Sequence, residues 1–429
     1  MKRARGVTLV LIVLFLAGVI WFPAGASASP AGSAAGPTAP AAVSPPGPGQ
    51  GATHNVRILT DIVPTPVAQR LVAWLTDVEA WVLSLDVGTQ VLKNTEDTAD
   101  SIFINGNFAR LLAAVYRITG KEIDLNEALK WCDSFFVNQR LAITSEINEA
   151  GYWVDLSRNP KGNIYFGDGG TAASAVAAIL DYADPKKRWL YLKALERYAR
   201  FVADGVLFDP QGFGRETTAS WVIAEGDDKG ALGCGFYDGH LSIKPYTIAT
   251  ATTGGGFFAA LYRLTEKPEY KDIAAGAVAW LLKIRKPDGE IPYILDGQAS
   301  ADWPLDTLSY CTEAFIAADV YLRDENLKLT LGTEIKPTID WLLARQNPDG
   351  SWGEMQSADQ QRSPRAVSLL AWYYRNVEND PRVKDAILNY CLFLLDPQKS
   401  GAYGIKKLVR TTGFAGLTVA EILKPGSTY

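Results

Sequence analysis

An excess of basic residues is absent from this chain. Its 429 residues include 42 lysines and arginines but 47 aspartates and glutamates, which leaves a formal net charge of -5. Binding to nucleic-acid phosphates needs clustered positive charge, so the composition argues against a nucleic-acid partner. Cysteine is scarce as well. Three of the four cysteines, Cys132, Cys311 and Cys391, lie in apolar stretches, where buried thiols and disulfide bridges are both compatible with the sequence.

Extended alternation of apolar and polar residues is also missing, which argues against a large β-sheet as the core. Only short ribbons in the longer loops are compatible with the pattern. Apolar and aromatic residues are plentiful, since 48% of the residues are hydrophobic and 12 are tryptophans. They provide ample apolar surface for one well-packed core.

The N-terminus has the pattern of an export signal. Basic residues within 1–6 precede an apolar run over 7–22, and Ala26 and Ala28 supply an A-x-A cleavage pattern. We predict a signal peptide at 1–28 that is cleaved after Ala28; an uncleaved N-terminal anchor is the alternative. Residues 29–60 are rich in alanine, proline and glycine, which predicts a disordered tether. We therefore expect a secreted, cell-surface or periplasmic protein, without stable membrane insertion after cleavage, whose residues 61–429 form one domain.

Two kinds of helical segment alternate along that domain. One kind has large apolar residues, mostly including tryptophan, at three- and four-residue spacing: 68–85, 126–142, 189–207, 273–285, 334–345 and 381–395. The other kind is rich in small residues near its start: 101–119, 169–183, 249–265, 307–323, 363–378 and 411–424. Six such alternations predict an all-α fold, an (α/α)6 toroid of six helical hairpins. The small-residue helices would lie inside and the tryptophan-bearing helices outside.

One motif resembles a known family. The sequence QNPDGSW at 346–352 is similar to the motif of triterpene cyclases in which Gln, Gly and Trp brace adjacent helices of an α/α toroid, and 285–290 is a weaker version of it. The chain lacks the D-x-D-D and D-D-x-x-D motifs of those enzymes, so the resemblance implies the architecture more than the activity. Toroidal prenyltransferases need His and Cys ligands for zinc, whereas only His54 and His240 occur here. We predict no metal and no cofactor.

Two further segments, 107–120 and 165–174, are similar in style to the six-hairpin glycosidases and toroidal polysaccharide lyases. This resemblance implies an exported carbohydrate-active enzyme, either a glycoside hydrolase or a lyase or epimerase acting on a uronate-containing glycan. The alternatives are a non-catalytic toroid that binds a glycan, peptide or protein, and a terpenoid cyclase-like protein.

The fold predicts where a site would lie. In a toroid the inner helices run parallel, so their N-termini gather at one mouth, where each contributes a partial charge of about +0.5. An anionic polysaccharide or oligosaccharide would be favoured there. The residues that we expect to bind substrate are those near these N-termini or in the two long loops: Asp97, Asp100, Asn105, Trp153, Tyr165, Trp221, Tyr310, Arg362, Arg365, Tyr403 and Arg410.

Hydrolysis of a glycosidic bond requires two carboxyl groups, and Asp168, Asp306 and Glu313 are the candidates. Asp168 and Asp306 are equally explained as N-caps, and Glu313 as a paired internal charge. For lyase or epimerase chemistry, His240 and Tyr246 would provide the base and acid. A structural role for His240, and packing of Trp153 onto the ring in place of sugar contact, are the alternatives.

Overall fold

Folded structure is described for residues 58–85, 102–154, 163–207, 218, 220–237, 240–355, 357 and 363–429 in a computed structural model. All belong to one unit, His54–Tyr429. The predicted signal peptide and the tether up to residue 57 lie outside the described residues. Leu59, at the end of that predicted tether, donates its backbone N–H to the Leu423 carbonyl at 3.0 Å, so the folded part begins slightly earlier than residue 61. No helix in these ranges is long and apolar enough to cross a membrane.

Helices follow one another in six pairs along the described chain. The outer members are α1 (Thr65–Ser84), α3 (Glu122–Asn138), α5 (Pro185–Asp204), α8 (Pro268–Lys283), α10 (Glu325–Glu334) with α11 (Lys336–Leu343), and α14 (Pro381–Leu394). The inner members are α2 (Ile102–Thr119), α4 (Phe166–Ile179), the continuous run α6 (Thr247–Ala249), η2 (Thr250–Phe257) and α7 (Phe258–Thr265), α9 (Pro304–Leu322), η3 (Ser363–Ala366) with α13 (Val367–Asn376), and α16 (Val409–Leu423). Short helices η1 (Leu180–Tyr182) and α15 (Pro397–Ala402) lie in connections.

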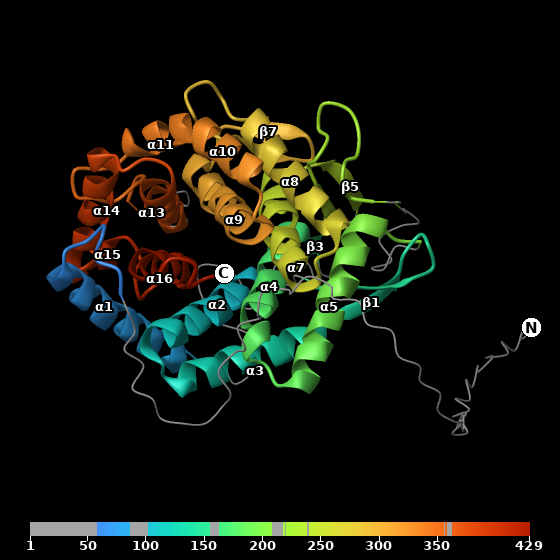
Figure 1. Ribbon diagram of the computed structural model, residues 1–429, viewed down its shortest axis with the longest axis horizontal. Helices are drawn as coiled ribbons and strands as arrows, with labels where there is room; N and C mark the ends of the chain where they lie inside the picture. The colour runs from blue at the N-terminus through green and yellow to red at the C-terminus, as the bar shows by residue number, and fades with distance from the viewer. Residues whose placement is uncertain are drawn as a thin grey trace, which may run out of the picture. The chain divides into compact units, whose positions relative to one another are not determined.

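The inner helices close into a ring. Each contacts the next in the order α2, α4, η2, α9, α13 and α16, and α16 contacts α2 again (Figure 1). Outer helices pack against this ring, as α3 does on α2 and α4. The predicted (α/α)6 toroid is therefore confirmed. The predicted segments lie within a few residues of the observed helices, except that α10 was not predicted, because 334–345 covers only α11.

Residue size explains which helix lies inside. A Cβ atom at Gly255 of η2 would lie 2.3 Å from the Cβ of Ala314 in α9, so the close approach of these inner helices requires glycine. Tryptophans such as Trp131 and Trp280 are buried on the outer helices. Trp189 on α5 differs from this pattern, because 58% of its surface is exposed.

The glutamine-to-tryptophan motif braces two outer helices, as predicted. Gln346 donates through Nε2 to the Ala386 carbonyl of α14 at 2.8 Å, and Trp352 donates through Nε1 to the Leu342 carbonyl of α11 at 2.8 Å. Between them, Gly350 has φ +93°, and a Cβ there would lie 2.4 Å from the Asn389 carbonyl oxygen. Both constraints select glycine at this turn.

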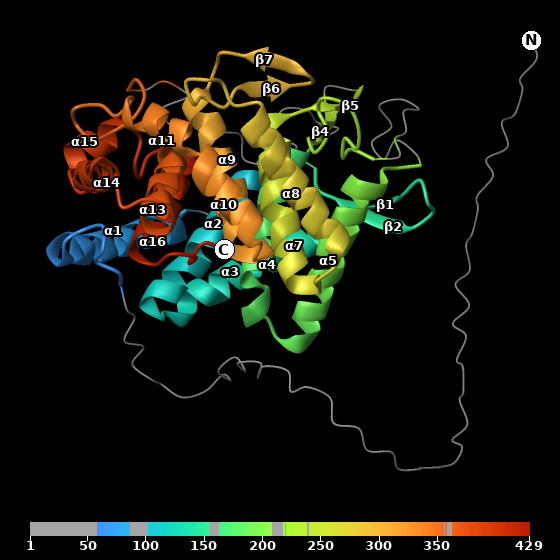
Figure 2. The same ribbon diagram turned by 45° about the horizontal axis from the view of Figure 1, so that its top comes forward.

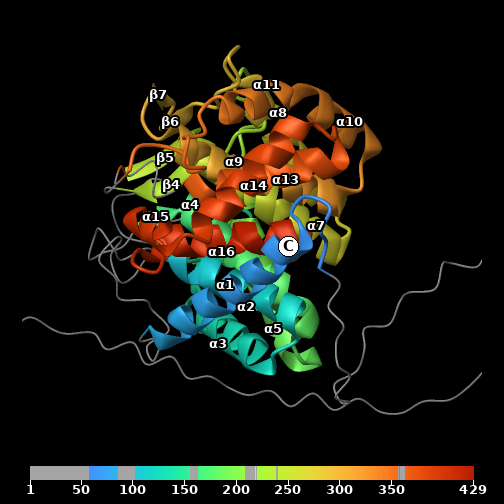
Figure 3. The ribbon, with the colours of Figure 1, turned by 90° about the vertical axis from the view of Figure 1, so that its left-hand side faces the viewer.

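Seven short strands lie between outer helices and the inner helices that follow them. They form β1 (Arg140–Ile143) with β2 (Glu149–Tyr152), the sheet β3 (Ile164–Tyr165), β4 (Gly233–Tyr237) and β5 (His240–Pro245), and the ribbon β6 (Tyr293–Leu295) with β7 (Gln298–Ser300). All pairs are antiparallel, with Ile164 opposite Phe236 and Tyr293 opposite Ser300. Strands β4–β7 gather at one end of the helices, where the inner helices begin (Figures 2 and 3).

All four cysteines lie in the described residues and are buried thiols, so the alternative of disulfide bridges is wrong. Burial raises the pKa of the Cys391 thiol to about 12, so these side chains act as small apolar groups.

Candidate functional site

The end of the ring where the inner helices finish is filled by the segment after α16. Arg117, near the end of α2, donates through Nη1 to the carbonyl oxygens of Ser427 at 2.6 Å and Tyr429 at 2.7 Å. The Glu421 carboxylate accepts bonds from the backbone N–H groups of Gly426 and Thr428, both at 2.9 Å. Residues 427–429 therefore occupy this end of the ring (Figure 1).

A buried ionic cluster lies at the centre of the ring. The Glu313 carboxylate of α9 is 2.5 Å from Nη2 of Arg110 on α2 and 2.5 Å from Nε of Arg365 in η3. Burial by itself would raise the pKa of Glu313, but the two guanidinium groups outweigh it and lower the pKa to about 2. The predicted alternative for Glu313, a paired internal charge, matches this geometry. Its catalytic role stays a prediction.

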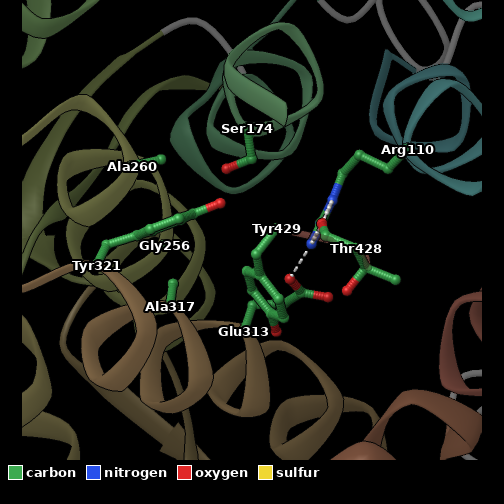
Figure 4. A pocket seen from close by; sticks show the side chains of 9 residues that line it. All are labelled: Arg110, Ser174, Gly256, Ala260, Glu313, Ala317, Tyr321, Thr428 and Tyr429. Carbon is green, nitrogen blue, oxygen red and sulfur yellow. Dashed lines mark hydrogen bonds and ion pairs between the residues drawn. The ribbon is translucent and has the colours of Figure 1, made fainter. Parts of the chain in front are cut away.

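Tyr429 completes this cluster (Figure 4). Its ring lies 5.5 Å from the guanidinium carbons of both Arg110 and Arg365, and its hydroxyl accepts a bond from Arg365 Nη2 at 3.0 Å. The cavity beside it, where Ser174 and Tyr321 also contribute to the wall, has a volume of about 10 Å³. Ligand pockets usually measure about 300–1,000 Å³, so this space holds no more than about one water molecule. A sugar would have to bind nearer the other end.

That other end is the mouth, where two candidate acids lie in the first turns of inner helices. Asp168 is the third residue of α4, and Asp306 the third of α9. Neither is the N-cap, because Tyr165 and Trp303 occupy those positions, so the capping explanation is wrong for both. Asp168 is partly exposed whereas Asp306 is 2% exposed.

Tyr246 precedes the inner helix that lies between those of the two acids. It is the N-cap of α6, which contacts both α4 and α9. Burial raises the pKa of Tyr246 well above its usual value, and the charges of Tyr293, Cys234, Asp168 and Tyr310 add to this effect. A buried phenol of this kind keeps its proton and acts as an acid or hydrogen-bond donor before it acts as a base. At the mouth Tyr246 thus lies within electrostatic range of Asp168 and of two further phenols, Tyr293 and Tyr310.

His240 is not part of this group. It begins β5 and Tyr246 follows that strand, so at about 3.3 Å per residue the two are about 20 Å apart along the chain. One proton-transfer site needs both groups within hydrogen-bond reach of the same substrate carbon and oxygen. The predicted pairing of His240 with Tyr246 as base and acid is therefore not supported by the geometry.

Two predicted sugar-binding aromatics are in the interior. Trp153 is 2% exposed and donates its indole N–H to the Phe135 carbonyl at 2.7 Å. It therefore packs its loop onto the ring, which was the predicted alternative to sugar contact. Trp221 is 1% exposed, with ring centroids 5.0 Å from Phe166 and 5.1 Å from Phe201. Direct sugar contact by either is a wrong prediction, because apolar packing outcompetes exposure for rings of this size.

The remaining predicted binding residues lie in different parts of the ring. Arg365 is fully buried against Glu313 and is not available to a ligand at the mouth. Arg410, 5% exposed, lies 4.4 Å from the Phe103 ring centroid near the starts of α16 and α2, and Asn105 is buried in the first turn of α2. Tyr403 packs edge-on against Phe393 of α14. Tyr165 is the N-cap of α4, and Tyr310 is buried in the second turn of α9. Asp97, Asp100 and Arg362 lie outside the described residues.

Two residues at the mouth were missed by sequence reasoning. Trp303 precedes α9 and is 37% exposed, and its ring centroid is 5.4 Å from that of Tyr293 on β6. Tyr293 in turn is 6.0 Å from Tyr246, edge-on. The Asp296-Gly297 dipeptide, a signal for a two-residue hairpin, could have located the ribbon that carries Tyr293.

Comparison with known proteins identifies the fold. No protein-family model matches the sequence, and no curated protein matches it. Solved structures that are similar include a family 88 glycosyl hydrolase from Bacteroides vulgatus, with TM-score 0.56 and 13% identity over 82% of this chain and 98% of that one. A polysaccharide lyase has TM-score 0.55 and 11% identity over 82% and 96%. An inactive variant of an α-1,6-mannanase from Salegentibacter sp. HEL1_6, in complex with α-1,6-mannotetrose, has TM-score 0.52 and 11% identity over 83% and 97%.

At these identities the likeness establishes the architecture, and the chain is an (α/α)6 toroid like the hydrolase and lyase above. None of the three structures named here is a terpenoid cyclase. The motif at 346–352 therefore belongs to the way this ring is built.

Proposed function

We propose that the protein is a carbohydrate-active enzyme that hydrolyses a glycosidic bond at the mouth of its toroid. The observation that carries the proposal is the position of Asp168, Tyr246 and Asp306 at the starts of three successive inner helices. The centre of the ring, by contrast, is filled, and its cavity is too small for a sugar ring. The hydrolases and lyase among the similar structures support the same class of substrate.

The two aspartates have the chemistry that hydrolysis needs. One carboxylic acid gives its proton to the leaving oxygen as the C–O bond breaks, and the other carboxylate takes a proton from the attacking water or attacks the carbon itself. We assign Asp168 to the water side because it is the partly exposed one. Tyr246, which keeps its proton, would donate a hydrogen bond to substrate.

An anionic glycan is the substrate that we favour. The N-caps of α4, α6, α9 and α16 make no side-chain capping bond, so backbone N–H groups at four helix starts lack that partner. Their dipoles favour negative charge at the mouth. A uronate would be attracted, whereas a neutral sugar would gain nothing from this field.

The test is turnover of neutral and uronate-containing polysaccharides by the purified protein. Release of reducing ends without an ultraviolet-absorbing unsaturated product is expected for hydrolysis. Asp168→Asn and Asp306→Asn should each lower the rate by at least about 10²-fold, a typical contribution of general acid–base catalysis. Asp227→Asn, in a fully exposed loop, is the matched control and should keep full activity. Binding of a polysaccharide without turnover would overturn the enzymatic proposal.

Elimination or epimerisation is the second candidate, favoured by the buried Tyr246 phenol beside Asp168. An unsaturated product would establish elimination, and a changed sugar without chain cleavage would establish epimerisation. Export is also part of the proposal, supported by the basic and apolar pattern of residues 1–28. N-terminal sequencing of the protein from the culture medium or periplasm should then find Ser29 as the first residue.

A further inference from the structure

Aromatic residues occupy the N-cap positions of three successive inner helices. Tyr165 precedes α4, Tyr246 precedes α6 and Trp303 precedes α9, and none makes a side-chain capping bond. Ser, Thr, Asp and Asn are the residues that stabilise this position, because their side-chain oxygens accept a backbone N–H of the first turn. At the mouth the chain therefore forgoes stability that a small polar residue would provide.

Polar N-caps occur on three outer helices. Asp184, Asp324 and Asp380 are the N-caps of α5, α10 and α14, and each side-chain carboxylate accepts backbone N–H bonds from the first turn. The outer helices α1, α3, α8 and α11 make no side-chain capping bond, but their N-caps are not aromatic. Because the three rings at the mouth do not cap their helices, they call for another role.

Trp303 is the most exposed of these rings and the most constrained. Its backbone is in the left-handed region, with φ 55° and ψ 46°, which is unfavourable for a bulky residue. Even so, 37% of its surface is exposed, whereas burial is what normally stabilises tryptophan. Such a conformation persists where the surrounding structure holds it, and it concentrates at binding sites.

A rigid ribbon supports the neighbouring ring. The β6–β7 hairpin turns at Asp296 and Gly297, which both have positive φ. Ser242 Oγ donates to the Asp296 carboxylate at 2.8 Å, and Gly297 N–H donates to the Pro245 carbonyl at 3.0 Å. Ile294 N–H donates to Thr247 Oγ1 at 2.9 Å, which ties the ribbon to the start of α6. The ribbon therefore holds Tyr293 in one place.

These contacts make a continuous aromatic strip. Trp303 meets Tyr293 edge-on at 5.4 Å, and Tyr293 meets Tyr246 edge-on at 6.0 Å. Tyr246 lies within electrostatic range of Asp168. The strip runs from solvent at Trp303 toward Asp168. Exposed rings of this kind suit the apolar C–H faces of pyranose rings, while phenol hydroxyls suit their edges.

We propose that Trp303, supported by Tyr293, is a stacking subsite for a sugar unit of the glycan, one that binds outside the unit at the reacting bond. This inference rests on the proposed function, because it presumes a glycan ligand. It goes beyond that function in assigning specificity for chain length: an oligosaccharide long enough to reach Trp303 binds more tightly than a disaccharide at the acids alone.

The experiment compares Trp303→Ala and Trp303→Asn with Trp189→Ala, an exposed tryptophan on the outer helix α5. Affinity is measured by calorimetry with mannotetraose and with tetragalacturonate, and also with the disaccharide of each. For the tetrasaccharide that the wild type binds, both Trp303 variants should have an affinity about tenfold lower than that of the wild type. Their affinity for the disaccharide should be unchanged. Trp189→Ala should bind like the wild type.

A readout without sugar tests the strain argument. Asparagine suits both the N-cap and the left-handed backbone, so Trp303→Asn should raise the denaturation midpoint while it weakens binding. Equal tetrasaccharide affinity in the wild type and both Trp303 variants would overturn the subsite and leave the proposed function standing. Absence of binding and turnover in the wild type with every glycan would overturn both.

Discussion

Arg110 and Glu313 form an ion pair across the centre of the ring, because they belong to α2 and α9, the first and fourth of its six inner helices. The Nη2 to Oε2 distance is 2.5 Å. With Arg365 and Tyr429 in the same cluster, the pair fills the ring where a channel would otherwise run. This filled centre is the reason why we propose the ligand site at the mouth, among residues at the helix starts.

Removing the charge of Glu313 should destabilise the protein. Glu313→Gln leaves two buried guanidinium groups without their anion, which typically costs about 3–5 kcal/mol. Urea denaturation at pH 7 measures this. The control is Glu334→Gln, whose partner Arg285 lies 3.1 Å away at the surface, and which should cost less than about 1 kcal/mol. Loss of turnover with unchanged stability would instead favour the catalytic role that sequence predicted for Glu313.

The ion pair of Arg110 and Glu313 should also determine how stability falls at low pH. Because the pKa of Glu313 is lowered to about 2, below the unfolded value near 4.3, its contribution is present above about pH 4 and is lost as pH falls toward 2. Wild-type stability should therefore fall more steeply than that of Glu313→Gln over this window. Parallel curves from denaturation at a series of pH values would contradict the assignment.

A second buried carboxyl, that of Asp124, should make stability change with pH in the opposite direction. Burial, with the nearby charge of Glu79, raises the pKa of Asp124 in α3 to about 7. Because this exceeds the unfolded value near 3.9, the folded state binds the additional proton, and stability is lost as pH rises from about 4 through 7. Asp124→Asn should flatten that dependence and be more stable than the wild type at pH 8. Glu122→Gln, exposed in the same first turn, should leave the slope unchanged.

Tyr429 should be a major packing residue. Tyr429→Ala removes the ring between Arg110 and Arg365 and enlarges the central cavity, with an expected cost of about 3–5 kcal/mol. Tyr182→Ala, which removes a more exposed ring near Arg117, should cost less than about 1 kcal/mol. Similar denaturation midpoints for the two variants would show that residues 427–429 do not support the ring.

The turn of the 346–352 motif should not accept a side chain. Gly350→Ala must place its Cβ 2.4 Å from the Asn389 carbonyl oxygen at φ +93°, so we expect a loss of at least about 2 kcal/mol. Gly426→Ala has φ +73° with open space around the new Cβ, and it isolates the backbone contribution of about 1 kcal/mol. The difference in thermal midpoint between the two variants measures the brace between α11 and α14.

Substitutions of His240 and of Tyr246 should have different effects on the rate of turnover. Tyr246→Phe removes the phenol beside Asp168 and should lower the rate, whereas His240→Ala, about 20 Å away along β5, should leave a hydrolase unaffected. The pH–rate profile of both variants is the measurement. A silenced His240→Ala enzyme with an intact fold would restore the lyase or epimerase mechanism.

The sequence by itself determined the architecture. Apolar spacing predicted twelve helical segments, and small residues such as Gly255 indicated which helices approach closely. A Cβ at Gly255 would lie 2.3 Å from the Cβ of Ala314, so this glycine cannot be replaced unless a backbone moves. The motif at 346–352 also revealed its bracing role, since Pro, Asp and Gly encode a turn locally. These features depend on residues near one another in the chain.

Only the tertiary structure decided what the polar and aromatic residues do. Arg110 and Glu313 are separated by 203 positions, and no local pattern announces that they meet. The same holds for Trp221, buried among rings from three other segments, and for Trp303, whose exposure follows from the ribbon beside it. The electrostatics and burial of a side chain are sums over neighbours distant in sequence, so they exist only once the ring has closed.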